Sequence, residues 1–110
     1  AYDVDGDGVK GKRRTWLRVP PGHGYPDGMA VDTDDHVWIA FYDGGCIRRY
    51  DPDGALTREV PLPVPRVTAC TFGGEPDVLY ATCARGGRRP RLLDRLRADL
   101  AGALFEIRLA

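Results

Sequence analysis

The pattern of apolar and polar residues predicts short β-strands joined by tight turns. Residues 37–42 form an unbroken apolar run rich in β-branched and aromatic side chains, which predicts a strand buried on both faces. Residues 56–60 contain both apolar and polar side chains, as in an outer strand with one face in water. Residues 33–35 are of the types that form tight hairpin turns. The chain is therefore predicted to be all-β.

Four strands of this kind follow one another in residues 27–63, and glycine-containing turns at 43–45 and 51–54 join the later ones. An antiparallel meander of four strands is the unit of a β-propeller blade. This stretch is therefore predicted to be one complete blade.

The strand pattern repeats at the spacing of propeller blades. Residues 50–54 match residues 2–6 at four of five positions, 48 positions further along the chain. Three other pairs of segments correspond in order: 27–32 with 68–73, 37–41 with 78–82, and 45–50 with 102–107. A period of about 40 to 48 residues with four strands per unit is typical of blades. We therefore predict one partial propeller domain in residues 1–110, with two outer strands of one blade in 1–20 and three strands of the next in 66–110.

The first strands are predicted to form a hairpin, in which residues 1–5 pair with residues 14–19 across a glycine-rich turn. Counted from Asp3, the twelfth position is Arg14, where a calcium-binding EF-hand loop needs a bidentate Glu, and no helix is predicted on either side. A plain hairpin is therefore favoured, although the stretch imitates the first half of such a loop with Asp3, Asp5 and Asp7.

The strand pattern is interrupted in residues 84–101. Leucines at helical spacing, with charged residues on the opposite side, predict one short helix near residues 91–101 within a loop insertion. The basic segment 85–91 raises the alternative of a nucleic-acid surface, but it lacks interleaved aromatic side chains. We therefore expect solvated arginines here and no nucleic-acid partner.

The composition narrows the range of possible binding partners further. The 110 residues carry 16 Lys and Arg against 16 Asp and Glu, and a formal charge of zero does not favour a polyanion. No apolar run approaches the length of a membrane span, and no signal-peptide pattern opens the chain. We expect no membrane partner and a cytoplasmic location. The three cysteines lack metal-ligand spacing and are expected to be buried thiols without a disulfide framework.

The strongest candidate for chemistry is Asp27, which stands between Pro26 and Gly28. The proline fixes one backbone angle and the glycine permits a sharp turn, so we expect the carboxylate at the mouth of a strand, where a ligand can reach it. His23 lies three residues before Pro26 in a connection rich in proline and glycine. It is a candidate substrate contact beside Asp27, and a solvated loop histidine is the alternative.

The ordered series of motifs resembles the SMP-30/gluconolactonase family, also called the regucalcin or luciferin-regenerating-enzyme family. The resemblance covers essentially the whole chain and rests on residues 25–32, 37–40, 44–45, 49–54, 72–74, 79–82 and 101–105. It implies an all-β, six-bladed propeller. Because the chain also begins without Met inside a predicted strand, we expect a C-terminal portion of a little over two blades. The missing N-terminal blades of the same propeller are its expected partner.

The resemblance also implies that the parent protein hydrolyses a sugar lactone around one divalent cation in the central channel. In the family this cation is held by a Glu, an Asn and the Asp of the Pro-Asp-Gly motif, and only the last corresponds to this chain, at Asp27. Asp27 is thus the expected metal ligand and the candidate catalytic base for the attacking water. A carboxylate that only caps a turn is the alternative. Ca²⁺ is expected first, with Zn²⁺, Mn²⁺ and Mg²⁺ left open.

Thr68 takes the place of Asp27 in the next blade, so its hydroxyl is expected to face the channel as a substrate contact. Asp32 and Asp43 are interpreted as turn residues. Because one carboxylate holds a cation weakly, the isolated chain is expected to be inactive. The alternatives to a lactonase are a non-catalytic calcium-binding or scaffold propeller, and a piece without a function of its own.

Overall fold

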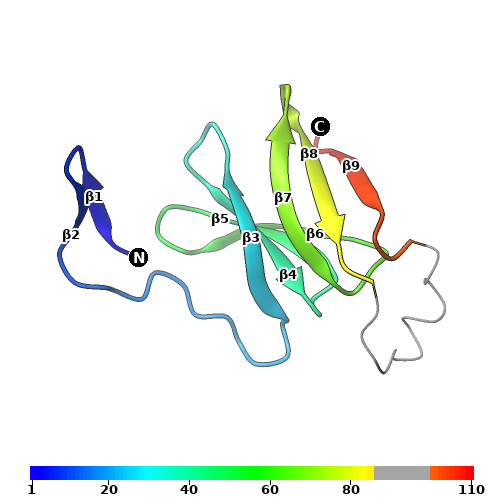
Figure 1. The fold of residues 1–110 in the computed structure, drawn as a ribbon, viewed down its shortest axis with the longest axis horizontal. Helices are drawn as coiled ribbons and strands as arrows, with labels where there is room; N and C mark the ends of the chain where they lie inside the picture. The colour runs from blue at the N-terminus through cyan, green and yellow to red at the C-terminus, as the bar shows by residue number, and fades with distance from the viewer. Residues whose placement is uncertain (86–99) are drawn as a thin grey trace.

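The computed structural model describes residues 1–85 and 100–110, and in these residues the chain forms three antiparallel sheets (Figure 1). The described residues contain no helix. They therefore include no helix that is long and apolar enough to cross a membrane. The helix predicted near residues 91–101 falls almost wholly on residues 86–99, outside the described part. The strands are β1 (Asp3–Asp5), β2 (Gly8–Lys10), β3 (Tyr25–Val31), β4 (Val37–Tyr42), β5 (Cys46–Tyr50), β6 (Leu56–Pro61), β7 (Val67–Gly73), β8 (Glu75–Cys83) and β9 (Leu104–Arg108).

The central sheet pairs its strands in the order β3-β4-β5-β6, and β4 is covered on both faces. Trp38 and Ala40 belong to one apolar cluster, Ile39 and Phe41 belong to another, and all four are at most 3% exposed. Because successive side chains of a strand point to opposite faces, a strand buried on both faces needs apolar residues throughout. The predicted burial of residues 37–42 is confirmed. β6 was predicted to keep one face out of water, and that prediction is wrong, because all its residues except Val60 are exposed.

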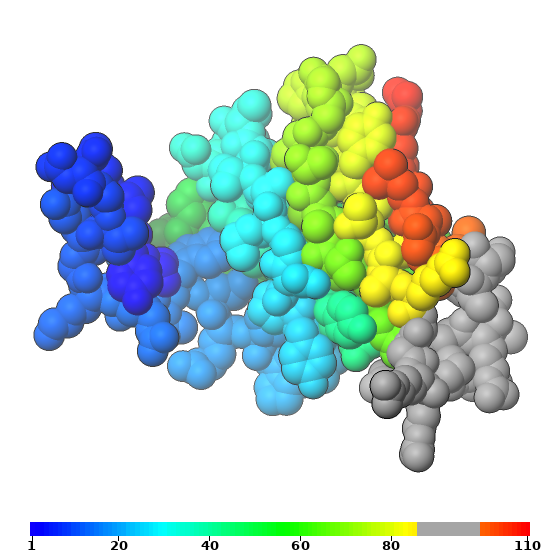
Figure 2. All heavy atoms as spheres, viewed as in Figure 1, coloured from blue at the N-terminus to red at the C-terminus, as the bar shows by residue number. Residues whose placement is uncertain are grey.

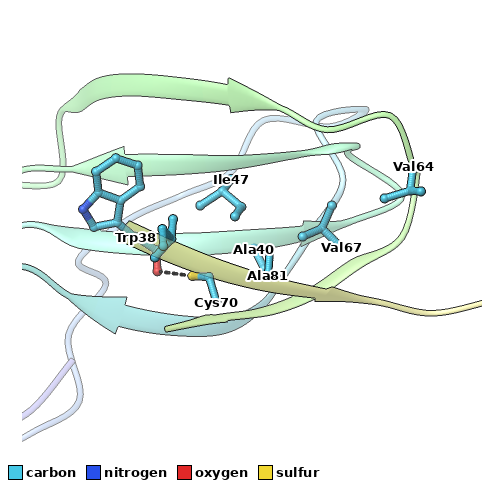
Figure 3. Close-up of a cluster of buried hydrophobic side chains, with 8 residues drawn as sticks. Trp38, Ala40, Ile47, Val64, Val67, Cys70 and Ala81 are labelled. Carbon is cyan, nitrogen blue, oxygen red and sulfur yellow. Dashed lines mark hydrogen bonds between the residues drawn. The ribbon is translucent and has the colours of Figure 1, made fainter. Parts of the chain in front are cut away.

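The sheet β7-β8-β9 packs against one face of the central sheet and shares a core with it. Figure 3 shows Trp38, Ala40 and Ile47 of the central sheet beside Val67, Cys70 and Ala81 of the second sheet. The Cys70 thiol donates to the Trp38 carbonyl oxygen at 3.4 Å, which ties β7 to β4 of the central sheet. As a result β3 and β7 run side by side (Figure 1).

The other face of the central sheet is covered by the extended segment 16–19. The Trp16 indole N–H donates to the Pro52 carbonyl oxygen at 2.8 Å, and its ring meets that of Tyr50 edge-on with centroids 6.3 Å apart. Leu17 and Val19 pack on the same cluster. This segment was predicted to be the hairpin partner of residues 1–5, and that prediction is wrong.

The partner of β1 is instead β2, joined to it by a two-residue turn that pairs Asp5 with Gly8. The Asp5 carboxylate accepts the backbone N–H of Asp7 at 2.8 Å, and Gly8 takes a φ of 113°, so the turn closes locally. Residues 16–19 then bury their apolar side chains against a large sheet, which a three-residue exposed strand cannot offer. The stretch thus forms a hairpin, but a shorter one than predicted.

Candidate functional site

Two of the candidate site residues lie in β-bulges at corresponding places in two neighbouring strands. In β3, Asp27 and Gly28 together stand opposite Ala40 of β4, because the register shifts between Pro26 and Met29. In β7 the register shifts where Thr68 is inserted between two paired residues of that strand. A bulge bends its strand and redirects the side chain of the extra residue, which is why bulges are frequent beside active sites.

The two bulges touch through Gly28. A Cβ atom on this glycine would lie 2.7 Å from the Cα and Cβ atoms of Ala69 and 2.9 Å from the carbonyl oxygen of Thr68. No side chain fits there, so the glycine lets the backbones of β3 and β7 approach closely. The expectation that Gly28 turns the chain into the strand is wrong, because it lies within β3. Asp27 and Thr68 are nevertheless brought to adjacent positions on neighbouring strands.

The Asp27 carboxylate faces solvent and, within the described residues, makes no hydrogen bond and no ion pair. An exposed carboxylate without a protein partner keeps both oxygens available to a hard divalent cation, so its donor set fits such an ion. No group of three or more His, Cys, Asp or Glu side chains in the described part of the chain could complete a metal site around it. The described residues therefore do not form a complete metal site of such side chains by themselves.

The Thr68 hydroxyl is hydrogen bonded to the hydroxyl of Thr82 on β8, with 2.8 Å between the two oxygens. Thr68 is half-buried and Thr82 is exposed. A hydroxyl has one donor and two acceptor positions, so this pair retains capacity for a further polar group. The sequence pointed to Thr68 through the blade repeat and did not point to Thr82.

His23 lies in the loop before β3, at the same end of that strand as Asp27. Its side chain is exposed, and among the described residues its ring makes no hydrogen bond or ion pair. Its backbone is held firmly: the N–H donates to the Pro20 carbonyl oxygen at 3.3 Å, and the carbonyl oxygen accepts from Arg48 Nη1 at 2.8 Å. The structure thus places His23 in the loop that leads into the strand of Asp27, and no hydrogen bond links the two side chains among the described residues.

Arg48 was not singled out by the sequence, yet it is the most buried charged side chain near this end of the sheet. It is 8% exposed, its Nε donates to Glu59 Oε2 at 2.7 Å, and its guanidinium lies 4.3 Å from the centroid of the Phe41 ring. Burial by itself lowers the pKa of Arg48, but the hydrogen bond to Glu59 raises the pKa above its ordinary value. Arg48 therefore stays charged while buried.

Asp32 lies at the opposite end of β3 and has a structural role. One carboxylate oxygen accepts the backbone N–H groups of Asp34 at 2.9 Å and His36 at 3.0 Å. The other accepts Trp38 Nε1 at 2.9 Å and Arg49 Nε at 2.7 Å. Burial alone would raise the pKa of Asp32, but these hydrogen bonds from Trp38, Arg49 and the backbone lower it to about 2. The interpretation of Asp32 as a turn residue is confirmed.

Asp43 is likewise a turn residue, as interpreted. It adopts a φ of 57° in the turn between β4 and β5 and pairs with Arg66 Nε at 3.3 Å. A hollow of about 490 Å³ lies beside it, bordered by the loop before β3 and by Tyr25 and Pro26. Asp27 does not line this hollow, although its neighbour Pro26 does.

Solved structures of the same fold extend well beyond this chain. A luciferin-regenerating enzyme superposes with a TM-score of 0.78 at 28% identity, over 97% of this chain and 36% of its own. A calcium-binding protein, regucalcin, from Agrobacterium tumefaciens gives a TM-score of 0.78 at 27% identity, over 96% and 36%. The chain is therefore part of an all-β propeller, as predicted, with a candidate site on the first strands of two adjacent sheets.

Residues 1–85 match the model of the SMP-30/Gluconolactonase/LRE-like region, and the chain belongs to that family, which confirms the resemblance. It is 39% identical over 110 residues to regucalcin from Sus scrofa, covering 97% of this chain and 36% of that protein. It is 38% identical over 113 residues to pentonolactonase XacC from Haloferax volcanii, covering 100% and 38%. The chain thus spans little more than a third of the length of these relatives.

Proposed function

We propose that the full-length protein containing this chain is a metal-dependent lactonase that opens the ring of a sugar lactone. Family membership and the similarity to a pentonolactonase support this activity. The observation that carries it is the Asp27 carboxylate, exposed and without a protein partner, in a bulge that touches the bulge of Thr68.

In this proposal Asp27 is one ligand of a divalent cation, and the remaining ligands come from other blades of the same propeller. Ca²⁺ is the first candidate, because a similar solved protein is named calcium-binding, and Zn²⁺, Mn²⁺ or Mg²⁺ are open to the same carboxylate. A cation bound there supplies a Lewis acid for the lactone carbonyl. The missing N-terminal blades are thus the partner that completes the site.

The residues of this chain then handle protons and orientation. Asp27 accepts a proton from the attacking water as the water oxygen bonds to the carbonyl carbon. The bond between that carbon and the ring oxygen breaks, the ring oxygen takes up the proton, and the product is an open-chain hydroxy acid. The Thr68 hydroxyl, fixed by Thr82, contacts a substrate oxygen, and His23 contacts the substrate at the rim.

The second candidate is a non-catalytic calcium-binding or scaffold propeller, in which Asp27 holds Ca²⁺ without chemistry. The similarity to proteins named regucalcin favours it. Under either function we propose one partial propeller domain in residues 1–110, inactive when isolated, in a cytoplasmic protein without a nucleic-acid or membrane partner.

Hydrolysis of gluconolactone by the full-length protein separates the two candidates, followed by the acid released into a weakly buffered indicator solution. The lactonase proposal expects activity that EDTA abolishes, that Ca²⁺ or another divalent cation restores, and that Asp27→Ala lowers by at least about 100-fold. Asp53→Ala, which removes an exposed turn carboxylate elsewhere, is the matched control and is expected to remain active. Activity unaffected by EDTA and by Asp27→Ala would refute the proposal.

A further inference from the structure

We propose that Arg48, held in place by Glu59, is a positioning residue that fixes the loop leading into β3 and thereby the location of Asp27. The inference rests on the proposed function of Asp27 as a metal ligand. It starts from the buried charge of Arg48, which neither the turns nor the strand pairing of β5 needs.

Arg48 has little freedom to adopt another orientation. Its side chain is 9% exposed, Nε is bound to Glu59 Oε2 at 2.7 Å, and Nη1 donates to the His23 carbonyl oxygen at 2.8 Å. The Phe41 ring lies against the guanidinium, 4.3 Å from its centroid. A buried cation is costly unless its donors are paired, so these contacts hold the planar fork in one arrangement.

The loop is pressed against the sheet at the same point. A Cβ atom on Gly24 would lie 2.6 Å from the Cα of Gly44, and one on Gly44 would lie 2.9 Å from the His23 carbonyl oxygen. Tyr25 then pairs with Tyr42 and the strand begins. The segment that carries Asp27 is therefore anchored by Arg48 before the bulge and by the contact of Gly28 with β7 within it.

Glu59 acts through Arg48. Its side chain is 50% exposed on the edge strand β6, and a pair with one partner so exposed adds little to stability. Its carboxylate nevertheless sets the plane of the guanidinium, because Nε and Nη1 belong to one rigid fork. Loss of the carboxylate is expected to loosen the contact with His23 more than it weakens the fold.

The neighbouring residue, Arg49, is a matched control within the same strand. Its side chain is 20% exposed and its Nε pairs with Asp32 Oδ2 at 2.7 Å, as short as the bond from Arg48 to Glu59. The partner of Arg49, Asp32, belongs to the turn after β3. His23, whose carbonyl oxygen accepts from Arg48, precedes β3. A general loss of stability affects variants of both arginines, and a positioning role affects only Arg48.

The experiment compares Arg48→Lys, Glu59→Gln and Arg49→Lys in the full-length protein. Calorimetric titration with Ca²⁺ is expected to show affinity about tenfold weaker for Arg48→Lys, an intermediate loss for Glu59→Gln, and a change below about twofold for Arg49→Lys. Lysine keeps the charge but cannot make both bonds of the fork. On gluconolactone, Arg48→Lys is expected to lower kcat more than it raises KM.

Hydrogen exchange at the amides of residues 23–28 provides a second readout that does not need metal or substrate. Faster exchange there in Arg48→Lys and Glu59→Gln, and not in Arg49→Lys, supports the positioning role. If the wild-type protein hydrolyses no lactone, the proposed function fails, and Ca²⁺ affinity and exchange still decide the role of Arg48. Equal Ca²⁺ affinity and equal exchange in all variants, or equal losses for Arg48→Lys and Arg49→Lys, would overturn it.

Discussion

The position of Asp27 depends on a neighbour without a side chain. Gly28 lets β3 approach β7 so closely that a methyl group in its place would meet the backbone at Thr68 and Ala69. The bulge in β3 and the bulge in β7 thus face each other across two sheets, although about 40 residues separate them in the chain. Asp27 and Thr68 are therefore placed by a close contact between backbones and not by contact between their own side chains.

The depressed pKa of Asp32 makes stability depend on pH. Its pKa is about 2 in the folded protein against an ordinary value of 3.8, so the folded state binds the proton less readily than the unfolded state. Its contribution is complete above pH 3.8 and is lost as the pH falls toward 2. Asp32→Asn in the full-length protein is therefore expected to be less stable at pH 7 and to lose less stability on acidification. Urea unfolding at pH 7, 4 and 3 measures both effects.

Asp51→Asn is the control for this pH dependence. The Asp51 carboxylate accepts the backbone N–H groups of Asp53 at 3.0 Å and Ala55 at 2.8 Å, as Asp32 does in its own turn. No arginine pairs with it among the described residues. A smaller change in pH dependence is expected for this variant. An equal change in both would show that the hydrogen bonds from Trp38 and Arg49 to Asp32 contribute nothing to it.

The sequence could locate Asp27 but not Arg48, for a physical reason. Asp27 belongs to a local motif with proline and glycine on either side, which marks it in the sequence, although the bulge that places it in β3 is not visible there. Arg48 and Arg49 stand side by side and look alike in the sequence. Arg48 is buried where the loop before β3 returns over it at His23, 25 residues earlier in the chain, and no periodicity records that contact.

At the level of elements, the strands of the two larger sheets were predictable because their faces are distinct. β4 is apolar throughout and lies between two clusters, while β6 is mostly polar and exposed and lies at an edge. The hairpin at the start was mispaired because residues 8–10 and residues 14–19 both suit a strand. Residues 16–19 pack instead on the apolar face of the central sheet, which is distant in the sequence. The bulges could not be predicted, since an inserted residue leaves the apolar pattern nearly unchanged.

The segment 16–19 is expected to stabilise the central sheet although it belongs to no strand. Trp16 covers Tyr50 and binds the Pro52 carbonyl oxygen, and Gly54 is packed against the Trp16 backbone. Trp16→Ala in the full-length protein is expected to lower the free energy of unfolding by about 2 kcal/mol, less than a fully buried tryptophan because the side chain is half-buried. Denaturant titration followed by circular dichroism measures the loss.

Val9→Ala is the matched control for Trp16. It removes an apolar side chain that is 64% exposed in the β1–β2 hairpin, away from the central sheet. A change within about 0.5 kcal/mol is expected for it. If Trp16→Ala is equally mild, the segment contributes little and its contact with the sheet is incidental.

At the level of the whole molecule, the two larger sheets share one core but leave other surfaces uncovered. β3 presents Tyr25, Met29 and Val31 at 69%, 60% and 59% exposure, and Figure 2 shows this strand on the open face beside β7. β9 is an edge strand with Leu104 at 66% exposure. In a propeller the first strands of the blades surround the channel and neighbouring blades cover one another. The chain spans only 36% of the related solved proteins, so these surfaces mark where further blades are expected.

The isolated chain of 110 residues is therefore expected to associate with itself. Size-exclusion chromatography with light scattering is expected to show species larger than a monomer, and a broad thermal transition. Met29→Lys together with Val31→Glu places opposite charges on the exposed strand, leaves the shared core intact, and is expected to shift the distribution toward monomer. As a control, Lys10→Glu together with Lys12→Glu changes charges in the exposed first segment and is not expected to shift the distribution toward monomer. A clean monomer that melts in one sharp transition would contradict the prediction, because two sheets with open edges would then be sufficient for a stable unit.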